Sequence, residues 1–289
     1  MKKIIALIMT ALIAVFGCFA LTGCVETEGE ALLKVVPVTL SSEQYAFAIK
    51  KGDTELKNSV NKFFKDKKTE IEGIFEKYTA EGVDLTAFGD DTIKTTPTGA
   101  ENELVVATNL EFAPFEYTNG KKIAGIDMEI AQLLATYLNK TLVVVHMDFE
   151  AVVTTVSTKP EYDIGIAGLT ITPERQEEVD FSDPYFGAAQ CIVVAKDDTT
   201  FDNLTTAKDV ENKLKELTGK AAKCGGQKAT TSQFYVEGSE DFGFAGFKNL
   251  TFSGYKSAAL AANDMLNGNI AFVVVDETTA NALVKSITK

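Results

Sequence analysis

From Glu103 onward, short apolar runs alternate with stretches whose apolar residues recur at helical spacing. The runs indicate buried strands, and the periodic stretches indicate amphipathic helices. Strands are expected at residues 104–107, 142–145, 164–167, 192–195 and 270–275, and helices at 126–138, 149–157, 207–217 and 258–266. Strands and helices that alternate in this way predict an α/β fold with mainly parallel strands.

The chain before Glu103 has a different pattern. Residues 45–49 are predicted as a strand, and the apolar positions from Leu56 to Tyr78 keep helical spacing over what we interpret as two short helices. Residues 81–102 are rich in Gly, Asp, Thr and Pro and carry no periodic apolar positions. We therefore expect a solvent-exposed linker between two structured blocks.

The N-terminus has the features of a secretory signal. Two lysines precede an apolar run over residues 4–21 that is short for a membrane span, although a permanent membrane anchor is the alternative. Residues 21–24, Leu-Thr-Gly-Cys, resemble the bacterial lipobox, in which the cysteine becomes the lipidated first residue. We expect a signal peptide over 1–23, lipidation at Cys24, a tether over 24–30, and an extracytoplasmic protein that lipid anchors to the bacterial cell membrane.

Composition narrows the chemistry. The 289 residues are 45% apolar and 24% charged, as in globular proteins, and the net charge of −13 without a basic patch argues against nucleic acid as a partner. The single histidine, His146, is predicted to be a hydrogen-bonded strand residue. Cys191 and Cys224 could form one disulfide, but two separate core thiols are favoured. This inventory predicts neither a metal site nor a cofactor.

Polar and aromatic side chains follow the predicted strands. Asn109 and Phe112 come after the first strand, Phe149 after the second, Gly168 after the third and Asp276 after the last. Ligands of open parallel sheets bind beyond the carboxyl ends of the strands, so these residues are candidates for one site. Taken singly, each has another explanation, because Asn109 and Asp276 suit turns and the two phenylalanines suit a core.

Residues 168–175 carry the strongest local signal. Thr172 and Pro173 form an N-cap followed by proline at the first helical position, so a helix begins here. Thr170 and Arg175, the only arginine of the chain, then lie where a carboxylate could bind. A cation there opposes the helix dipole unless an anion is present, although pairing with the acids at 177, 178 or 180 is an alternative. With Asp276 and Asn109 as the complementary group, the pattern indicates a zwitterion site.

Three blocks resemble the amino-acid-binding proteins of ABC importers, the family 3 polar amino acid solute-binding group. They are residues 104–117, residues 164–175 with 179–186, and the run that ends at Asp276. The resemblance implies a two-lobed, type II periplasmic-binding-protein fold with a hinge and an interlobe cleft. It also implies a monomer that closes on a free, polar amino acid and delivers it to an ABC transporter permease.

The resemblance also implies residue roles. Arg175 and Thr170 would bind the α-carboxylate, and Asp276, Asn109 and the Gly168 carbonyl would bind the α-ammonium. Phe112 and Phe149 would pack on the ligand side chain. Further contacts would come from Thr230 and Thr231, in a loop in which alanine replaces the family's usual glycine.

The order of the segments departs from the family. Residues 33–53 and the helices up to Tyr78 resemble the segment that ordinarily closes such proteins, whereas the ordinary beginning lies at Glu103. We therefore expect a circular permutation. Lobe 1 would comprise 41–191, namely 41–80, the linker 81–102 and 103–191, and lobe 2 would comprise 192–289 with 31–40. The lobes would be joined by segments near 45–49 and 190–195.

Two other functions share this fold. Cyclohexadienyl dehydratases look similar in sequence, and ligand-sensing receptor modules on the same fold bind the same ligands. Catalysis needs an acid or base in the cleft, and Asp276 is already assigned to the ammonium. We therefore expect a binding protein without enzymatic activity.

Overall fold

The computed structural model describes residues 30–288, so the predicted signal peptide, Cys24 and all of the tether except Glu30 lie outside the described residues. The strands are β1 Leu33–Val36, β2 Glu43–Tyr45, β3 Ala48–Lys50, β4 Glu103–Thr108, β5 Glu111–Phe112, β6 Glu116–Asn119, β7 Lys122–Ala124, β8 Thr141–His146, β9 Ile164–Gly165, β10 Val179–Phe181, β11 Phe186–Ala188, β12 Gln190–Ala195, β13 Lys223–Gln227, β14 Thr251–Tyr255 and β15 Phe272–Asp276. The α-helices are α1 Thr54–Asp66, α2 Lys68–Thr79, α3 Ile126–Tyr137, α4 Val152–Thr158, α5 Pro173–Glu178, α6 Ala207–Glu216, α7 Thr231–Glu237, α8 Ala258–Leu266 and α9 Glu277–Ser286. Short 3-10 helices lie at Leu85–Ala87, Phe149–Ala151 and Gly219–Ala222. Within residues 30–288, no helix is both long and apolar enough to span a membrane.

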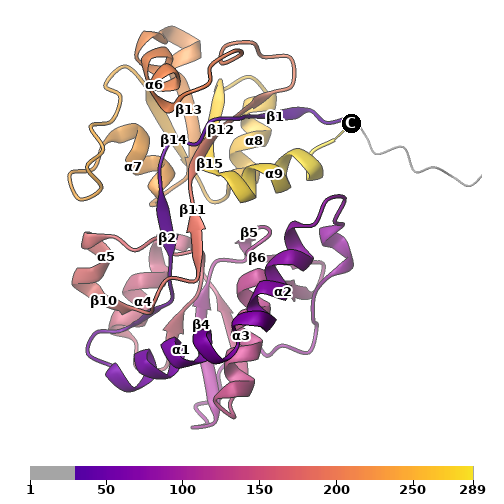
Figure 1. Ribbon diagram of the computed structural model, residues 1–289, viewed down its shortest axis with the longest axis vertical. Helices are drawn as coiled ribbons and strands as arrows, with labels where there is room; N and C mark the ends of the chain where they lie inside the picture. Colours follow the sequence, from indigo (N-terminus) through magenta and orange to yellow (C-terminus); the bar gives the residue numbers. More distant parts are fainter. Residues whose placement is uncertain (1–29, 289) are drawn as a thin grey trace, which may run out of the picture.

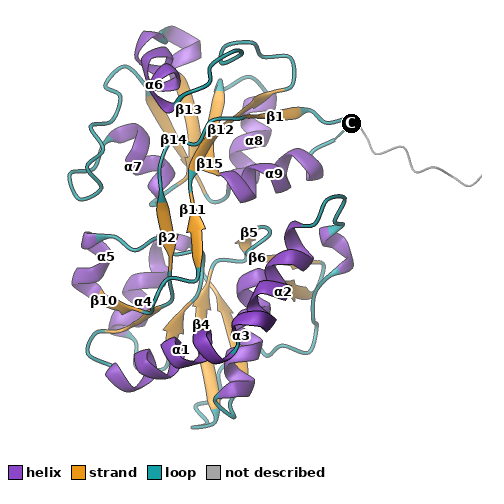
Figure 2. Cartoon of the chain, viewed as in Figure 1, coloured by secondary structure: helices purple, strands orange, loops and turns teal. Residues whose placement is uncertain are grey.

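The elements form two lobes, each built around a five-stranded sheet (Figures 1 and 2). The lower sheet in Figure 1 has the order β10-β3-β9-β4-β8, and the upper sheet has the order β1-β12-β15-β13-β14. Each sheet contains two parallel and two antiparallel pairings. The expectation of mainly parallel strands was therefore wrong, because strands from the N-terminal block and β12 enter the sheets without a helical crossover.

Helices cover both faces of each sheet because the strands alternate their apolar side chains. In β12, Val193 packs with α8 and α9, whereas Ile192 and Val194 face the opposite way and pack with α6 and α7. In the other lobe, the β4 residues Leu104 and Val106 contribute to the cluster that includes α1 and α3, and Ala107 packs with α4. These three-layer arrangements confirm the α/β class.

The N-terminal block contributes to both sheets. Strand β1 pairs with β12 along Leu33 to Val36, and β3 pairs with both β10 and β9. Figure 1 shows the indigo strand β1 beside the orange and yellow strands of the upper lobe, while α1 and α2 cover the lower lobe. The two predicted helices upstream of residue 80 are confirmed.

Strands β2 and β11 run side by side between the lobes and form a two-stranded antiparallel ribbon (Figure 1). The predicted strand at 45–49 was wrong, because the chain leaves this ribbon after Tyr45 and joins another sheet at Ala48. Residues 45–49 are all buried, so their apolar pattern does not mark the change. The predicted crossing at 190–195 was also wrong, because β12 lies within the upper sheet, where Gln190 pairs with Asp276.

Residues 81–102 are largely exposed, as expected, but they follow a defined path. Isolated bridges join Asp90 to Ile123 and Lys94 to Val143, and the partly buried Phe88 packs against the ring of Tyr78 with a centroid distance of 4.7 Å. The segment therefore lies against lobe 1.

Candidate functional site

Predicted site residues from both lobes line one small cavity. Phe112, Phe149, Gly168, Thr170 and Arg175 come from lobe 1, and Thr230, Thr231 and Asp276 come from lobe 2. Its volume is about 20 Å³, close to the space that a single water molecule needs. The lobes are thus closed on each other, and an amino acid could enter only if they separate.

Arg175 forms the positive end of the site. Its helix α5 begins as the sequence predicted, with the Thr172 hydroxyl accepting a hydrogen bond from the Arg175 N–H at 3.0 Å. The guanidinium donates to the carbonyl of Thr170 at 2.8 Å and to the carbonyl of Ala229, in the other lobe, at 3.2 Å. Since none of the described carboxylates forms an ion pair with this guanidinium, the alternative of pairing with neighbouring acids was wrong.

Burial changes the electrostatics of this arginine. Arg175 is only 9% exposed, and loss of solvation lowers the pKa of its guanidinium to about 10, so that it stays charged at neutral pH. Its Cζ atom lies 5.3 Å from the centroid of the Phe149 ring, a cation–π arrangement. A guanidinium has five N–H donors, of which two are engaged here, so it retains donors for a carboxylate.

Asp276 forms the negative end of the site. It ends β15 and precedes α9, and its Oδ1 accepts a hydrogen bond from the Tyr45 hydroxyl at 2.5 Å. Burial and the charge of Glu43 raise the pKa of Asp276 to about 7. Glu43 is itself buried and accepts hydrogen bonds from Thr170 Oγ1 at 2.9 Å and Ser41 Oγ at 2.7 Å. The site therefore combines one guanidinium with two buried carboxyl groups.

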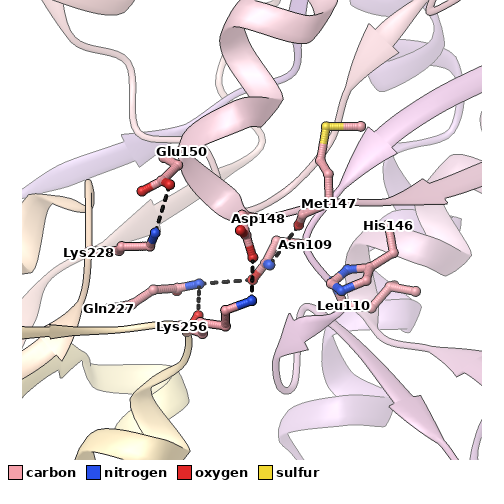
Figure 3. Close-up of polar contacts among 9 residues, drawn as sticks. All are labelled: Asn109, Leu110, His146, Met147, Asp148, Glu150, Gln227, Lys228 and Lys256. Atoms are coloured by element: carbon pink, nitrogen blue, oxygen red, sulfur yellow. Dashed lines mark hydrogen bonds and ion pairs between the residues drawn. The ribbon is translucent and has the colours of Figure 1, made fainter.

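Asn109 is the one predicted ligand-binding residue that does not line the cavity. Its Nδ2 donates to the Met147 carbonyl at 2.9 Å, and its Oδ1 accepts from Gln227 Nε2 at 2.8 Å (Figure 3). Both ends of its amide are thus engaged, one of them across the lobes. In this geometry Asn109 joins the lobes instead of facing the cavity.

The three threonines differ in what their hydroxyls offer. Thr170 Oγ1 donates to Glu43, and Thr230 Oγ1 donates to the Gln227 carbonyl at 2.6 Å. Thr231 Oγ1 instead accepts from Gln190 Nε2 at 3.1 Å, which leaves its own proton available. Of the three, Thr231 is best placed to donate to a ligand.

Two ion pairs connect the lobes at the rim of the site (Figure 3). Lys228 Nζ lies 2.7 Å from Glu150 Oε1, and Lys256 Nζ lies 3.4 Å from Asp148 Oδ1. The lysines come from loops that follow β13 and β14, and the acids flank Phe149. These pairs hold the closed arrangement from outside the cavity.

The isolated histidine and cysteines agree with the predictions. His146 ends β8, and its Nδ1 accepts a hydrogen bond from the Leu110 N–H at 3.1 Å. Cys191 and Cys224 are separate buried thiols, which confirms the favoured interpretation. Across residues 30–288, no cluster of histidine, cysteine and carboxylate side chains is suited to hold a metal ion.

Sequence reasoning missed three polar residues of the site. Glu43 and Tyr45 lie on β2, far upstream of the blocks that indicated a ligand, and Gln227 lies at the end of β13. The one available signal was the position of Tyr45 in a predicted hinge segment, because hinge strands border the cleft. Gln227 lies beside the loop with Thr230 and Thr231, which the sequence does indicate.

The sequence profile of the bacterial extracellular solute-binding proteins, family 3, matches residues 104–285. The arginine-binding extracellular protein ArtP of Bacillus subtilis (strain 168) is 36% identical over 113 residues, which are 39% of this chain and 42% of that protein. The chain thus spans less than half the length of this curated relative.

Two solved structures are also similar. The holo form of ArgBP from T. maritima matches with a TM-score of 0.53 and 31% identity over 64% of this chain and 74% of that one. The ancestral amino acid-binding protein AncCDT-1, a precursor of cyclohexadienyl dehydratase, matches with a TM-score of 0.54 and 26% identity over 65% and 76% of the respective chains.

Proposed function

Because the chain belongs to family 3 of the bacterial extracellular solute-binding proteins, we propose that it binds a free, polar L-amino acid outside the cytoplasm. It would act as a monomer and deliver the ligand to the permease of an ABC importer. The observation that carries this proposal is the convergence of Arg175 and Asp276, from different lobes, on one cavity. An α-amino acid carries the two complementary charges.

Each end of the site suits one charged group of the ligand. Arg175 would bind the α-carboxylate with its remaining guanidinium donors, helped by Thr231. Asp276 would bind the α-ammonium together with the Gly168 carbonyl, and Phe112 and Phe149 would pack on the side chain. Thr170 and Thr230, which line the cavity, would also contact the ligand. Asn109 would contribute by stabilising the closed arrangement of the lobes through its bond to Gln227.

The charge balance favours a cationic side chain. Glu43 and Asp276 together carry two negative charges when ionised, against one positive charge on Arg175. A zwitterion leaves this surplus unchanged, whereas a cationic amino acid neutralises it in a site where burial makes uncompensated charge costly. Among the similar proteins, ArtP and ArgBP have names that refer to arginine.

Binding requires hinge opening about β2 and β11, since the closed cavity is too small for an amino acid. On separation, the Arg175 bond to Ala229 and the Asn109 bond to Gln227 would break. The ligand would then replace part of these contacts when the lobes close again.

A lipid anchor at Cys24, after removal of residues 1–23, is part of the proposal. Its support is the lipobox-like sequence Leu21 to Cys24. The Cys24→Ala variant is expected to leave the membrane fraction or remain uncleaved, and to keep its ligand affinity because the cleft lies elsewhere. Membrane fractionation with a binding assay checks this, and persistent lipidation or lost binding would contradict it.

The circular permutation is likewise proposed. It is supported by the start of the family match at residue 104, while β1, β2 and β3 from upstream complete the two sheets and the hinge. Because Gln190 and Cys191 pair with β15, we move the proposed boundary from 191/192 to 189/190, so that lobe 1 would comprise 41–189 and lobe 2 would comprise 190–289 with 31–40. Specific cleavage between 81 and 102 should leave two fragments that stay associated and bind ligand, and dissociation would contradict the permutation.

A thermal-shift screen against the twenty amino acids tests the proposed function. A ligand that binds only the folded state raises the unfolding temperature by mass action. We expect the largest rise with L-arginine or L-lysine. No rise with any amino acid would contradict the proposal, and turnover of a cyclohexadienyl substrate would favour the enzymatic alternative.

A further inference from the structure

Two carboxyl groups, those of Glu116 and Asp127, are buried together behind the site. Glu116 begins β6, directly across from Phe112 in β5, and Asp127 lies in the first turn of α3. Both residues are fully shielded from solvent. Neither belongs to the cavity lining, so ligand contact does not explain them.

The two carboxyl groups differ in their hydrogen bonds. Asp127 Oδ2 accepts from the Gly168 N–H at 2.9 Å, and its Oδ1 accepts from the Tyr185 hydroxyl at 2.6 Å. The Glu116 oxygens receive no donor from the described residues. The Asp127 N–H donates to the carbonyl of Phe115, the residue before Glu116, at 2.8 Å, and the charge of Asp127 acts on the Glu116 carboxyl. Two ionised carboxylates buried side by side repel each other, so this arrangement favours a proton on one of them.

The electrostatic surroundings place that proton on Glu116. Burial, and next the charge of Asp127, hold the pKa of Glu116 well above its ordinary range, whereas the hydrogen bonds that Asp127 accepts limit its rise to a pKa of about 6. The other titratable groups that act on the pair are the Tyr185 hydroxyl and, at longer range, Asp276. No described cationic side chain forms an ion pair with either carboxyl.

The pair contacts three parts of the binding apparatus. Glu116 lies in the hairpin that carries Phe112, and Asp127 holds the backbone of Gly168, which adopts a φ of 53°. A Cβ atom at Gly168 would lie 3.0 Å from the Phe112 ring, so the loop and hairpin are closely fitted. Tyr185 precedes hinge strand β11, and its N–H donates to the Tyr45 carbonyl at 3.0 Å.

We propose that Glu116 and Asp127 hold one proton between them and act as positioning residues, fixing the Gly168 loop and the hinge residue Tyr185. Loss of the proton places a second negative charge beside Asp127 without a cation to offset it. The repulsion then moves Asp127 away from the Gly168 N–H. The consequence for ligand affinity rests on the proposed function, whereas the shared proton and the loop position do not.

The first test compares the wild type with Glu116→Gln, whose amide supplies the same hydrogen bond without titrating. A carboxyl group whose pKa is raised by folding makes the folded protein less stable as pH rises from the pKa of the group in the unfolded chain toward its pKa in the folded protein. Between about pH 6 and pH 8, the unfolding temperature of the wild type should fall relative to Glu116→Gln by about 3 °C per pH unit. The exposed Glu101→Gln serves as the matched control and should follow the wild type.

A difference that stays constant with pH would overturn the proposal. Infrared spectroscopy at neutral pH gives a second readout, because a protonated carboxylic acid has its own carbonyl band. Asp276, whose pKa is raised to about 7, contributes to this band in all three proteins. The band should therefore be larger in the wild type and in Glu101→Gln than in Glu116→Gln, and equal bands in the three proteins would also overturn the proposal.

The positioning role has separate readouts. The NMR signal of the Gly168 amide should shift in the wild type at pH values above those over which the unfolding temperature falls, because folded Glu116 loses its proton only there, and it should remain in place in Glu116→Gln. With L-arginine as the probe, the ratio of the wild-type Kd to the Glu116→Gln Kd should rise about threefold or more over that higher pH range. An amide signal that titrates equally in both proteins, or a constant Kd ratio, would reject the positioning role. If L-arginine does not bind but the Gly168 amide still titrates in the wild type, only the proposal of a cationic ligand would be contradicted, and the positioning role would stand.

Discussion

The inner cavity and its rim both join the lobes through charged groups, but they differ in exposure to water. Arg175 and Asp276 are 9% and 6% exposed, whereas the rim side chains of Lys256 and Asp148 are 63% and 46% exposed. An ion pair near the surface is screened by water and salt, whereas a charge in a buried site is not. The cavity should therefore determine affinity and specificity, and the rim should only adjust how readily the lobes close.

The largest effect is expected from Asp276→Asn, which keeps the shape of the side chain and removes its charge. Ligand binding should weaken by about 3 kcal/mol, since a buried hydrogen bond between charged groups is lost. The matched rim variant Asp148→Asn should cost less than about 1 kcal/mol. Calorimetry measures both, and equal losses at the two positions would remove the distinction between cavity and rim.

The pH dependence of binding sharpens the same contrast. Because the pKa of Asp276 is raised to about 7, the fraction that is ionised, and with it the affinity for an ammonium, should increase from about pH 6 to pH 8. The stability of the ligand-free protein should change in the opposite direction. Because folding raises the pKa of this carboxyl group, the free energy of unfolding falls as pH rises toward 7. In Asp276→Asn the rise in affinity should be absent, and the fall in stability should be smaller than in the wild type because only Glu116 still contributes to it. Trends of unchanged size in this variant would assign them to another group.

A somewhat smaller effect is expected from Arg175→Lys. Lysine keeps the positive charge but lacks the planar guanidinium fork, so binding should weaken by about 2 kcal/mol. The measurement is again a calorimetric titration, with thermal unfolding as the check on folding. Unchanged affinity would show that the carboxylate does not bind here.

The smallest effect is expected at the rim. Replacing both Lys228 and Lys256 by glutamine should weaken ligand binding by less than about 1 kcal/mol, because exposed ion pairs contribute little. The difference from the wild type should shrink as salt is added to about 0.5 M. A loss as large as that of Arg175→Lys, or one that salt leaves unchanged, would mean that the rim determines affinity as the cavity does.

Most of the cavity could be predicted from the sequence because its residues follow strand ends. Gly168 and Asp276 each come directly after an apolar run, and the Thr172-Pro173 start of α5 indicated where Arg175 would lie. Local rules of this kind depend on neighbours in sequence. They identify the edge of a sheet without knowledge of what lies across the cleft.

The remainder depended on contacts between distant segments. Glu43 reaches Thr170 across the chain, and Asn109 is occupied by Gln227 from the other lobe, so neither relation leaves a local pattern. The split at Ala46–Phe47 was missed because an apolar run looks the same in one sheet or two. Glu116 likewise occupies an ordinary polar position in a short hairpin, and only the packed structure reveals its burial beside Asp127.

A crystal structure with the amino acid that gives the largest thermal shift tests the central claim most directly. The account predicts that the α-carboxylate lies on the Arg175 guanidinium and the α-ammonium on Asp276, with the lobes closed around the ligand. A ligand bound with the opposite polarity, or outside the cavity lined by these two residues, would contradict it.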